Sequence, residues 1–318
     1  MVQIHHNLFI YKIYIYIYIY IYIMNKVIFN WEFTYEHIKH NLYSNSNIVV
    51  FVDIIPSENI EKKDNKWVYI QVESTLISGS QIQYLLKDNS RFDLILTFDP
   101  NLLHKNKSIK FLPNNKVYWT SPTNDLKINL NLPENLPIEY NISNKKFQIS
   151  MLCGGKNWCP GHQLRRKYWE NQKRILIPKK FIYSQNYEDL SIFDGNVKAS
   201  YNKDKTELFI DSMFHIAIEN NRAENYFTEK LIDCIVSKTL PIYYGCPNIH
   251  EYFNINGMII INDLNDIDKI NDLTEKYYYD HLIYIEENYQ KMLNLLSFKD
   301  QFINIINNKF NDNLIEKI

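Results

Sequence analysis

The chain has 318 residues, and its 35 basic and 36 acidic side chains give a formal net charge of −1 at pH 7. This balance excludes the strongly basic character that nucleic-acid-binding proteins and proteins of anionic membranes show. Hydrophobic residues make up 46% of the sequence, which is ample for packed cores, and the length favours two domains. The composition as a whole is that of a soluble enzyme.

The first 23 residues stand apart, because residues 13–23 alternate strictly between Ile and Tyr. A tract of alternating A and T encodes this pattern, and Met24 begins a stretch that is typical of a natural start. We interpret residues 1–23 as a low-complexity leader outside the fold, and we expect a cytoplasmic protein. The alternative is a membrane anchor, if the leader is expressed. As a helix, however, the alternating run would span only about 17 Å of a membrane core of about 30 Å.

Short apolar runs in the N-terminal part of the chain predict buried strands at residues 48–53, 67–72 and 92–98. Carboxylates follow two of these runs, with Glu73 after the second and Asp99 after the third. We expect these strands to form one α/β domain over residues 24–140.

A polar stretch rich in Asn and Pro covers residues 120–146. Such stretches are typical of domain boundaries. The sequence therefore predicts a second domain over residues 147–318, which ends in a largely helical region from about residue 268.

The second domain opens with a strand-like run at residues 147–153, followed by a glycine-containing loop and a helix-like segment. That segment begins with Arg165, Arg166 and Lys167. A strand, a glycine loop and a basic helix can together cradle a phosphate. The alternative is a basic helix face that is simply solvated.

Residues 213–218 and 240–244 predict two further buried strands, joined by a polar loop and a helix. Their order makes a βαβ unit, whose strands should be parallel with a right-handed crossover. Glu219 and Asn220 stand at the carboxyl end of the first strand, where open α/β sheets bind ligands.

The first turn of the predicted connecting helix carries Tyr226, Thr228, Glu229 and Lys230. A helix N-terminus attracts phosphate through its unpaired N–H groups, and Lys230 adds a full positive charge. Glu229 would repel phosphate but can accept hydrogen bonds from the hydroxyls of a ribose. The pattern therefore indicates a nucleoside diphosphate ligand, with ordinary surface residues of a first turn as the alternative.

Residues 214–254 resemble the donor-binding signature of the family ten glycosyltransferases, the α-1,3/1,4-fucosyltransferases. The resemblance rests on the Glu-Asn pair, on Tyr-x-Thr-Glu-Lys, on Leu-Pro-Ile-Tyr-Tyr-Gly and on Pro-Asn-Ile, and is nearly gapless. One departure is Lys238, where many members have Gly. Read from Met24, the chain is similar to the compact bacterial or viral members.

This resemblance implies which residues bind the donor, GDP-fucose. Tyr226, Glu229 and Lys230 would hold its ribose and diphosphate. The family's Glu-Asn pair falls on Glu219 and Asn220. The family also has a phosphate-binding Arg followed by aromatics, which implies Arg165, since Tyr168 and Trp169 follow it, with Arg166 as the alternative.

The resemblance further implies a GT-B fold, two Rossmann-like domains facing a cleft, and an inverting transfer of fucose to a hydroxyl of a glycan acceptor. A carboxylate of the acceptor domain would remove the hydroxyl proton. Glu73 is the candidate, Asp99 and Glu58 are the fallbacks, and a Glu that merely caps a strand is the alternative.

No cofactor is expected to be required, and a divalent metal would at most stimulate. The expected partners are the nucleotide-sugar donor and the glycan acceptor. The alternatives are a GT-B enzyme for another nucleotide sugar and an inactive glycan-binding relative.

Other features of the sequence carry less weight. The four cysteines form no C-x-x-C pair, which disfavours a zinc site or a disulfide scaffold. Asp266 and Asp268 have the D-x-D spacing of some metal-dependent glycosyltransferases, although capping is the commoner role in such a segment. A structural role is the more common one for isolated histidines such as His162 and His215.

Overall fold

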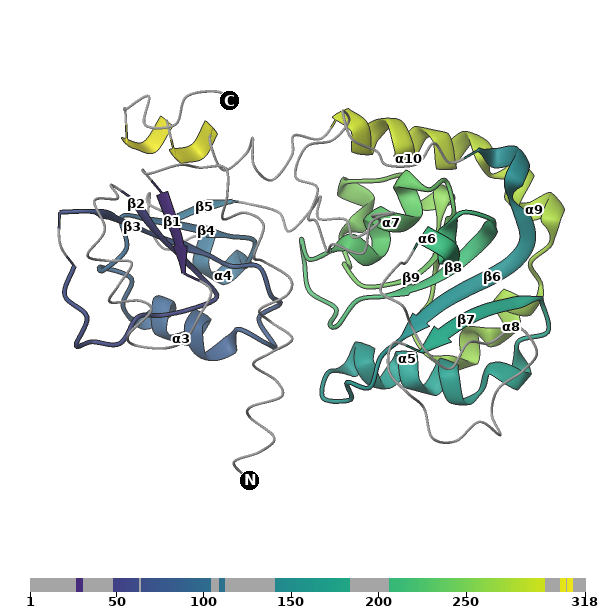
Figure 1. The fold of residues 1–318 in the computed structure, drawn as a ribbon, viewed down its shortest axis with the longest axis horizontal. Helices are drawn as coiled ribbons and strands as arrows, with labels where there is room; N and C mark the ends of the chain where they lie inside the picture. The colour runs from purple at the N-terminus through teal and green to yellow at the C-terminus, as the bar shows by residue number, and fades with distance from the viewer. Residues whose placement is uncertain are drawn as a thin grey trace. The chain divides into compact units, whose positions relative to one another are not determined.

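The computed structural model describes residues 27–30, 48–62, 64–103, 109–111, 141–183, 206–294, 304–306 and 308–310 (Figure 1). The predicted leader at residues 1–23 and most of the predicted boundary at residues 120–146 lie outside the described residues. Contacts divide the chain into two compact units, Met1–Asn114 with Phe298–Ile318, and Asn115–Ser297. No helix in the described ranges is long and apolar enough to cross a membrane.

The first unit contains a five-stranded parallel sheet in the order β1-β2-β3-β4-β5. Its strands are β1 (Val27–Asn30), β2 (Ile48–Val52), β3 (Lys66–Ile70), β4 (Leu94–Thr97) and β5 (Ile109–Phe111), and its helices include α3 (Gly79–Lys87) and α4 (Pro100–Leu103). The strands β2 and β4 are buried along their whole length, as expected of parallel strands that are covered on both faces.

At the carboxyl edge of this first sheet, Asp53 directly follows β2 and holds the start of the segment after β3. Its φ of 51° is in the left-handed region, which a short polar side chain tolerates better than most. Its carboxylate accepts hydrogen bonds from the backbone N–H groups of Val72 and Glu73, the latter at 2.9 Å. The backbone that carries Glu73 is therefore fixed by a neighbouring strand end.

The second unit contains another five-stranded parallel sheet, in the order β10-β9-β8-β6-β7. Its strands are β6 (Lys146–Cys153), β7 (Lys179–Tyr183), β8 (Ser212–Ile218), β9 (Leu240–Tyr244) and β10 (Ile259–Ile260). The chain builds outward from β6, first to β7 on one side and then to β8, β9 and β10 on the other. The direction of winding therefore reverses between β6 and β8.

Helices cover both faces of the second sheet (Figure 1). One face packs against α5 (Pro160–Glu170), α8 (Ile267–Asn271) and α9 (Glu275–Asp280), and the other against α6 (Thr206–Phe209) and α7 (Glu229–Val236). The helix α10 (Leu282–Asn294) contributes Ile285 to the first core and Met292 to the second. Alternate residues of β6 and β8 enter the first of these two cores. The predicted βαβ unit is confirmed as β8, α7 and β9, with Phe214 of β8 aligned with Leu240 of β9.

The predicted helical region after residue 268 forms three helices, α8, α9 and α10, up to Asn294. The break before α9 has a local cause. Thr274 is the N-cap of α9, and its hydroxyl accepts a hydrogen bond from the backbone N–H of Tyr277 at 3.0 Å. A residue whose side chain caps a new helix N-terminus ends the preceding one.

Lys238, the departure from the family pattern, directly follows the C-terminal turn of α7 with a φ of 54°. This left-handed conformation explains why Gly suits the position. Its side chain pairs with Glu286 at 2.7 Å and lies 4.5 Å from the centre of the Tyr289 ring. Lys238 therefore links the end of α7 to α10.

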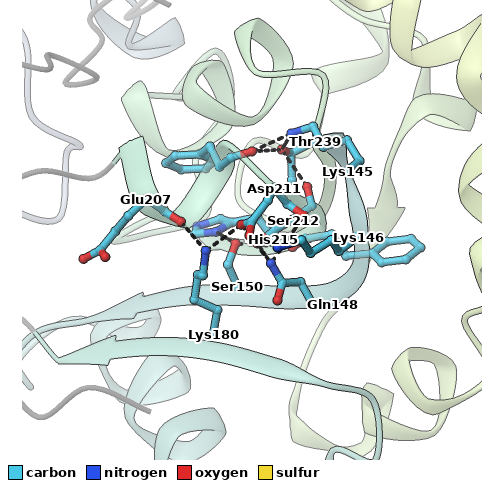
Figure 2. A network of polar contacts seen from close by, with 12 residues as sticks. Lys145, Lys146, Gln148, Ser150, Lys180, Glu207, Asp211, Ser212, His215 and Thr239 are labelled. Atoms are coloured by element: carbon cyan, nitrogen blue, oxygen red, sulfur yellow. Dashed lines mark hydrogen bonds and ion pairs between the residues drawn. The ribbon is translucent and has the colours of Figure 1, made fainter. Parts of the chain in front are cut away.

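A polar network lies at the amino ends of β6, β8 and β9 (Figure 2). Lys145 is buried there, and its ammonium donates to the backbone oxygen of Phe209 and to the hydroxyl of Thr239, at 2.5 and 2.7 Å. Burial lowers the pKa of Lys145 to about 7. Nearby, Asp211 forms ion pairs with Lys180 and Lys146. Hydrogen bonds and ion pairs therefore stabilise the amino edge of the second sheet.

Candidate functional site

The candidate site lies at the opposite, carboxyl edge of the second sheet, where β6 and β8 are neighbours. Ligands of open α/β sheets bind at this kind of reversal point. Gly161, in the first turn of α5, donates its backbone N–H to the backbone oxygen of Asn220 at 3.1 Å. A Cβ atom at Gly161 would lie 1.7 Å from the backbone oxygen of Glu219. Only glycine therefore lets α5 approach the end of β8 this closely.

Glu219 is completely buried at the end of β8. Its two carboxylate oxygens accept hydrogen bonds from the backbone N–H and the hydroxyl of Thr228, each at 2.7 Å. Burial raises the pKa of Glu219, while Lys230, 3.7 Å away, favours its charged form. The carboxylate thus anchors the start of α7, and its oxygens face protein groups.

The helix α7 begins at Glu229, with Thr228 as its N-cap. The predicted first turn that contained Tyr226 and Thr228 is therefore wrong by one turn. The reason is that the Thr228 side chain satisfies the helix N-terminus, so the segment before it is free to follow the loop. The sequence analysis placed Thr228 inside the first turn and missed its role as N-cap, although a Thr directly before Glu is a recognisable capping signal.

Glu229 and Lys230 lie together at this helix N-terminus. The Lys230 ammonium is 2.8 Å from the Glu229 carboxylate and 3.1 Å from the Thr228 hydroxyl. Burial opposes its charge, but the neighbouring carboxylates of Glu229 and Glu219 hold the pKa of Lys230 above its ordinary value. Both side chains of the Glu229–Lys230 pair are about one fifth exposed, so solvent and ligand can reach them.

Arg165 of α5 also lies near the N-terminus of α7, and it contacts the residue that follows Glu219. Its guanidinium donates to the amide oxygen of Asn220 at 2.5 Å. Its Nε is buried and has no hydrogen-bond partner among the described residues. Burial lowers the pKa of Arg165, although an arginine remains charged at neutral pH. Arg166 instead pairs with Glu170 on the exposed side of α5.

Tyr226 is only 1% exposed, in the loop before α7. It lies close enough to Arg165 to influence the pKa of the guanidinium. The structure therefore brings the residues predicted to bind the donor into one place, with two of them, Glu219 and Tyr226, buried behind the others.

The three candidate carboxylates of the first unit differ in their exposure to solvent. Asp99 accepts hydrogen bonds from the backbone N–H of Asn101 and from the hydroxyl of Thr75, at 2.8 and 2.6 Å. Glu58 is exposed in a loop, and Glu73 is partly exposed. Asp99 is therefore occupied with local structure, whereas Glu73 follows a strand end and has solvent access.

No group of three or more His, Cys, Asp or Glu side chains in the described part of the chain could hold a metal ion. Asp266 accepts the backbone N–H of Asn262 at 2.6 Å and pairs with Lys269, also at 2.6 Å. These contacts give it the capping role. The four cysteines are buried free thiols, and burial raises the pKa of Cys153 to about 12.

The sequence comparisons with known proteins all match fucosyltransferases. Residues 165–313 match the family model described as "Glycosyltransferase family 10 (fucosyltransferase) C-term". The chain is 34% identical over 101 residues to the alpha-(1,3)-fucosyltransferase FucT of Helicobacter pylori, a match that covers 31% of this chain and 21% of the relative. The matched region therefore spans about a fifth of that curated relative.

Solved structures are similar over most of the chain. A crystal structure of an alpha1,3-fucosyltransferase superposes with a TM-score of 0.51 at 20% identity and covers 91% of this chain and 90% of the other. A crystal structure of alpha1,3-fucosyltransferase with GDP has a TM-score of 0.50 at 19% identity and covers 90% of each chain.

This likeness defines the fold class, because the two parallel α/β units have the GT-B architecture of glycosyltransferases. The predicted fold class is thus confirmed. The sequence matches agree with this fold: residues 165–313 are similar to glycosyltransferase family 10, and the resemblance stated from the sequence is confirmed.

Proposed function

We propose that this protein is an inverting glycosyltransferase that transfers fucose from GDP-fucose to a hydroxyl of a glycan acceptor. The observation that carries the proposal is the convergence of Lys230 and Arg165 on the N-terminus of α7, beside the partly exposed Glu229. The match of residues 165–313 to the fucosyltransferase family model and the similarity to a fucosyltransferase crystallised with GDP support the choice of donor.

In this proposal the donor's charges are matched by the protein. Lys230, Arg165 and the N-terminal N–H groups of α7 neutralise the diphosphate, whose negative charge grows as the sugar leaves. Glu229 accepts hydrogen bonds from the ribose hydroxyls, and Asn220 donates from its amide. Glu219 and Tyr226 do not contact the donor in this proposal. They hold the loop before α7 and the N-terminus of α7 in place. The cations supplied by the chain make a metal unnecessary for this step.

The acceptor side of the proposal rests on Glu73. Its carboxylate takes the proton of the acceptor hydroxyl while that oxygen forms a bond to the anomeric carbon. The bond between that carbon and the phosphate oxygen breaks in the same displacement, and GDP leaves. The hydrogen bond from the Glu73 backbone N–H to Asp53 keeps the base on a fixed strand end.

Transfer from another nucleotide sugar is the second candidate, because it would use the same residues. Lys230 and Arg165 would bind the phosphates and Glu229 the ribose, and all nucleotide sugars share these groups. The two candidate donors differ in their nucleobase and their sugar, so the identity of the donor must be tested directly. A glycan-binding relative without activity would bind acceptor in the absence of any nucleotide.

The test is a calorimetric titration of the full chain with GDP, GDP-fucose, GDP-mannose and UDP. We expect GDP and GDP-fucose to bind, with GDP-fucose preferred to GDP-mannose and UDP weakest. Preference for UDP would replace the fucosyl proposal with the second candidate. Binding of none of the four would overturn the nucleotide site.

A further inference from the structure

Buried polar side chains contact the backbone of Glu73 at the carboxyl edge of the first sheet, and the proposed reaction gives two of them no role so far. Gln71, which directly follows β3, is 2% exposed, and Thr97, the last residue of β4, is completely buried. The backbone N–H of Gln71 donates to the backbone oxygen of Leu96 at 2.9 Å. The pairing of β3 with β4 therefore continues to Gln71, which gives its side chain a fixed starting point.

The backbone of Glu73 is held on both sides of its Cα atom. Its N–H donates to the carboxylate of Asp53 at 2.9 Å. Its carbonyl oxygen accepts from the Gln71 amide nitrogen at 3.1 Å and from the Ser78 hydroxyl at 3.2 Å. The peptide groups before and after Glu73 are each planar, so holding both of them sets the direction of the Cα–Cβ bond between them. Contacts from the ends of β2 and β3 and from the start of α3 therefore determine where the side chain of Glu73 begins.

Thr97 favours the orientation of the Gln71 amide that this contact needs. The Thr97 hydroxyl accepts the backbone N–H of Asp99 at 2.9 Å and donates its single proton to the amide oxygen of Gln71. The amide NH2 group of Gln71 then faces the carbonyl oxygen of Glu73, which can only accept. A flipped amide would set two carbonyl oxygens against each other in a buried place. One orientation of the Gln71 side chain is therefore favoured over the other.

We propose that Gln71, oriented by Thr97, is a positioning residue for the proposed general base, because it holds the backbone of Glu73 so that the carboxylate keeps one direction toward the acceptor hydroxyl. This inference rests on the proposed function, since it acts on the base assigned there. A base must lie within hydrogen-bond distance of the proton that it removes. A shift of about 1 Å caused by a change far from the reacting atoms can lower a rate about a hundredfold. Gln71 and Thr97 would thus contribute to the rate without touching a substrate.

Substitutions can separate this positioning role from a contribution to stability alone. Gln71→Met keeps a long unbranched side chain but removes both hydrogen bonds of the amide. Thr97→Val keeps a β-branched side chain without the hydroxyl, and Thr97→Ser keeps the hydroxyl. Asn65→Ala is the matched control, because the buried Asn65 amide accepts from the Trp67 indole at 2.9 Å at the opposite, amino end of β3. It removes a buried side-chain hydrogen bond from the same sheet, away from Glu73.

The experiment measures the release of GDP from GDP-fucose by the full chain, with a mixture of free glycans as acceptors and with water as the only acceptor. We expect Gln71→Met to lower kcat about ten- to a hundredfold, with KM for GDP-fucose and the calorimetric affinity for GDP unchanged. Thr97→Val should also lower kcat, and Thr97→Ser should recover most of the loss. Asn65→Ala should lower the melting temperature but keep kcat. Added to Glu73→Gln, Gln71→Met should have no further effect, because it acts through the base.

The outcomes separate this inference from the proposed function. If Glu73→Gln is impaired but Gln71→Met keeps its kcat, or if the two effects simply add, the positioning role is overturned and the base stands. If Glu73→Gln turns over normally, or if the unmodified chain releases no GDP, the proposed function itself fails and the inference fails with it. Should Gln71→Met not fold, the two Thr97 variants decide: a lower kcat in Thr97→Val than in Thr97→Ser supports the inference, and equal values contradict it.

Discussion

At the scale of single residues, Lys230 is the charge on which the proposed donor binding depends most. Its charge is balanced by the carboxylates of Glu229 at 2.8 Å and Glu219 at 3.7 Å. Removing it would withdraw a cation from the diphosphate and would leave two carboxylates close to where the phosphates bind. Both effects act against binding.

We therefore predict that Lys230→Ala weakens GDP binding about ten- to a hundredfold, as expected for a hydrogen bond to a charged group. Calorimetric titration measures this directly. Lys291→Ala is the matched control, because Lys291 also pairs with a glutamate, Glu287 at 2.8 Å, but on the exposed side of α10. Equal GDP affinity in the two variants would remove Lys230 from the site.

A second residue-scale prediction concerns Lys145, whose pKa is lowered to about 7 by burial. In the unfolded chain this lysine titrates near 10.4. Between these two pKa values only the unfolded chain binds the proton. The free energy of unfolding therefore gains a contribution as pH rises through this window, by at most about 1.4 kcal/mol per pH unit.

Urea unfolding at several pH values between 6 and 9.5 tests this, with Lys145→Met as the variant that cannot titrate. Relative to Lys145→Met, the unmodified chain should gain stability above about pH 7, and the difference should be constant below it. Other groups, such as the buried cysteines, titrate in both proteins and cancel. Parallel stability curves over the whole range would show that Lys145 keeps an ordinary pKa.

At the scale of elements, the close approach of α5 to the end of β8 depends on Gly161. A methyl group there would collide with the backbone oxygen of Glu219, which cannot move independently of the strand. The helix would have to shift, and Arg165 and His162 would shift with it. The stability of the second unit and the geometry of its candidate site are thus coupled through Gly161.

We predict that Gly161→Ala lowers the free energy of unfolding by about 1–3 kcal/mol, the usual cost of overpacking, and also weakens GDP binding. Gly79→Ala is the control, because Gly79 begins α3 and a Cβ atom there would meet nothing within 4 Å. That variant should be neutral or slightly stabilising. Thermal unfolding of the two variants decides the matter, and equal melting temperatures would contradict the predicted clash.

The elements also show what the sequence could and could not indicate. Buried apolar runs predicted β2, β3, β4, β6, β8 and β9, because strands covered on both faces are continuously hydrophobic. The short strands β1, β5 and β7 were not predicted. The start of α7 was misplaced by one turn, because the hydrogen bonds from Thr228 to Glu219 join residues nine positions apart.

For the candidate site, the sequence grouped Glu219, Asn220, Glu229 and Lys230 because they follow one strand and begin one helix. It did not indicate how closely α5 approaches them. Gly161 brings two separate βα connections together, and its backbone N–H donates to the backbone oxygen of Asn220. Such a juxtaposition leaves no periodic pattern in the sequence.

At the scale of the whole molecule, the proposed reaction divides its work between the two units. The donor residues belong to the second unit, and Glu73 belongs to the first. A substitution of Glu73, the proposed general base, should therefore leave donor binding unchanged. This separation allows the catalytic role of Glu73 to be measured apart from any effect on the nucleotide site.

We predict that Glu73→Gln lowers the rate of fucosyl transfer about 10²- to 10⁴-fold, the usual contribution of a general base, while GDP affinity stays unchanged. Transfer assays and calorimetry on the same preparation give both quantities. Glu58→Gln, in the same unit but in an exposed loop, serves as the control. A Glu73→Gln variant with normal turnover would leave the base to be found elsewhere.

The ion pair between Lys230 and Glu229 has a consequence for selectivity. The Lys230 ammonium pairs with the Glu229 carboxylate at 2.8 Å. A diphosphate that attracts Lys230 releases Glu229 to accept the ribose hydroxyls, so recognition of one half of the nucleotide prepares recognition of the other. A nucleoside without phosphates would have to compete with Lys230 for the same carboxylate. If the proposed donor site is right, the pair should therefore favour GDP over guanosine.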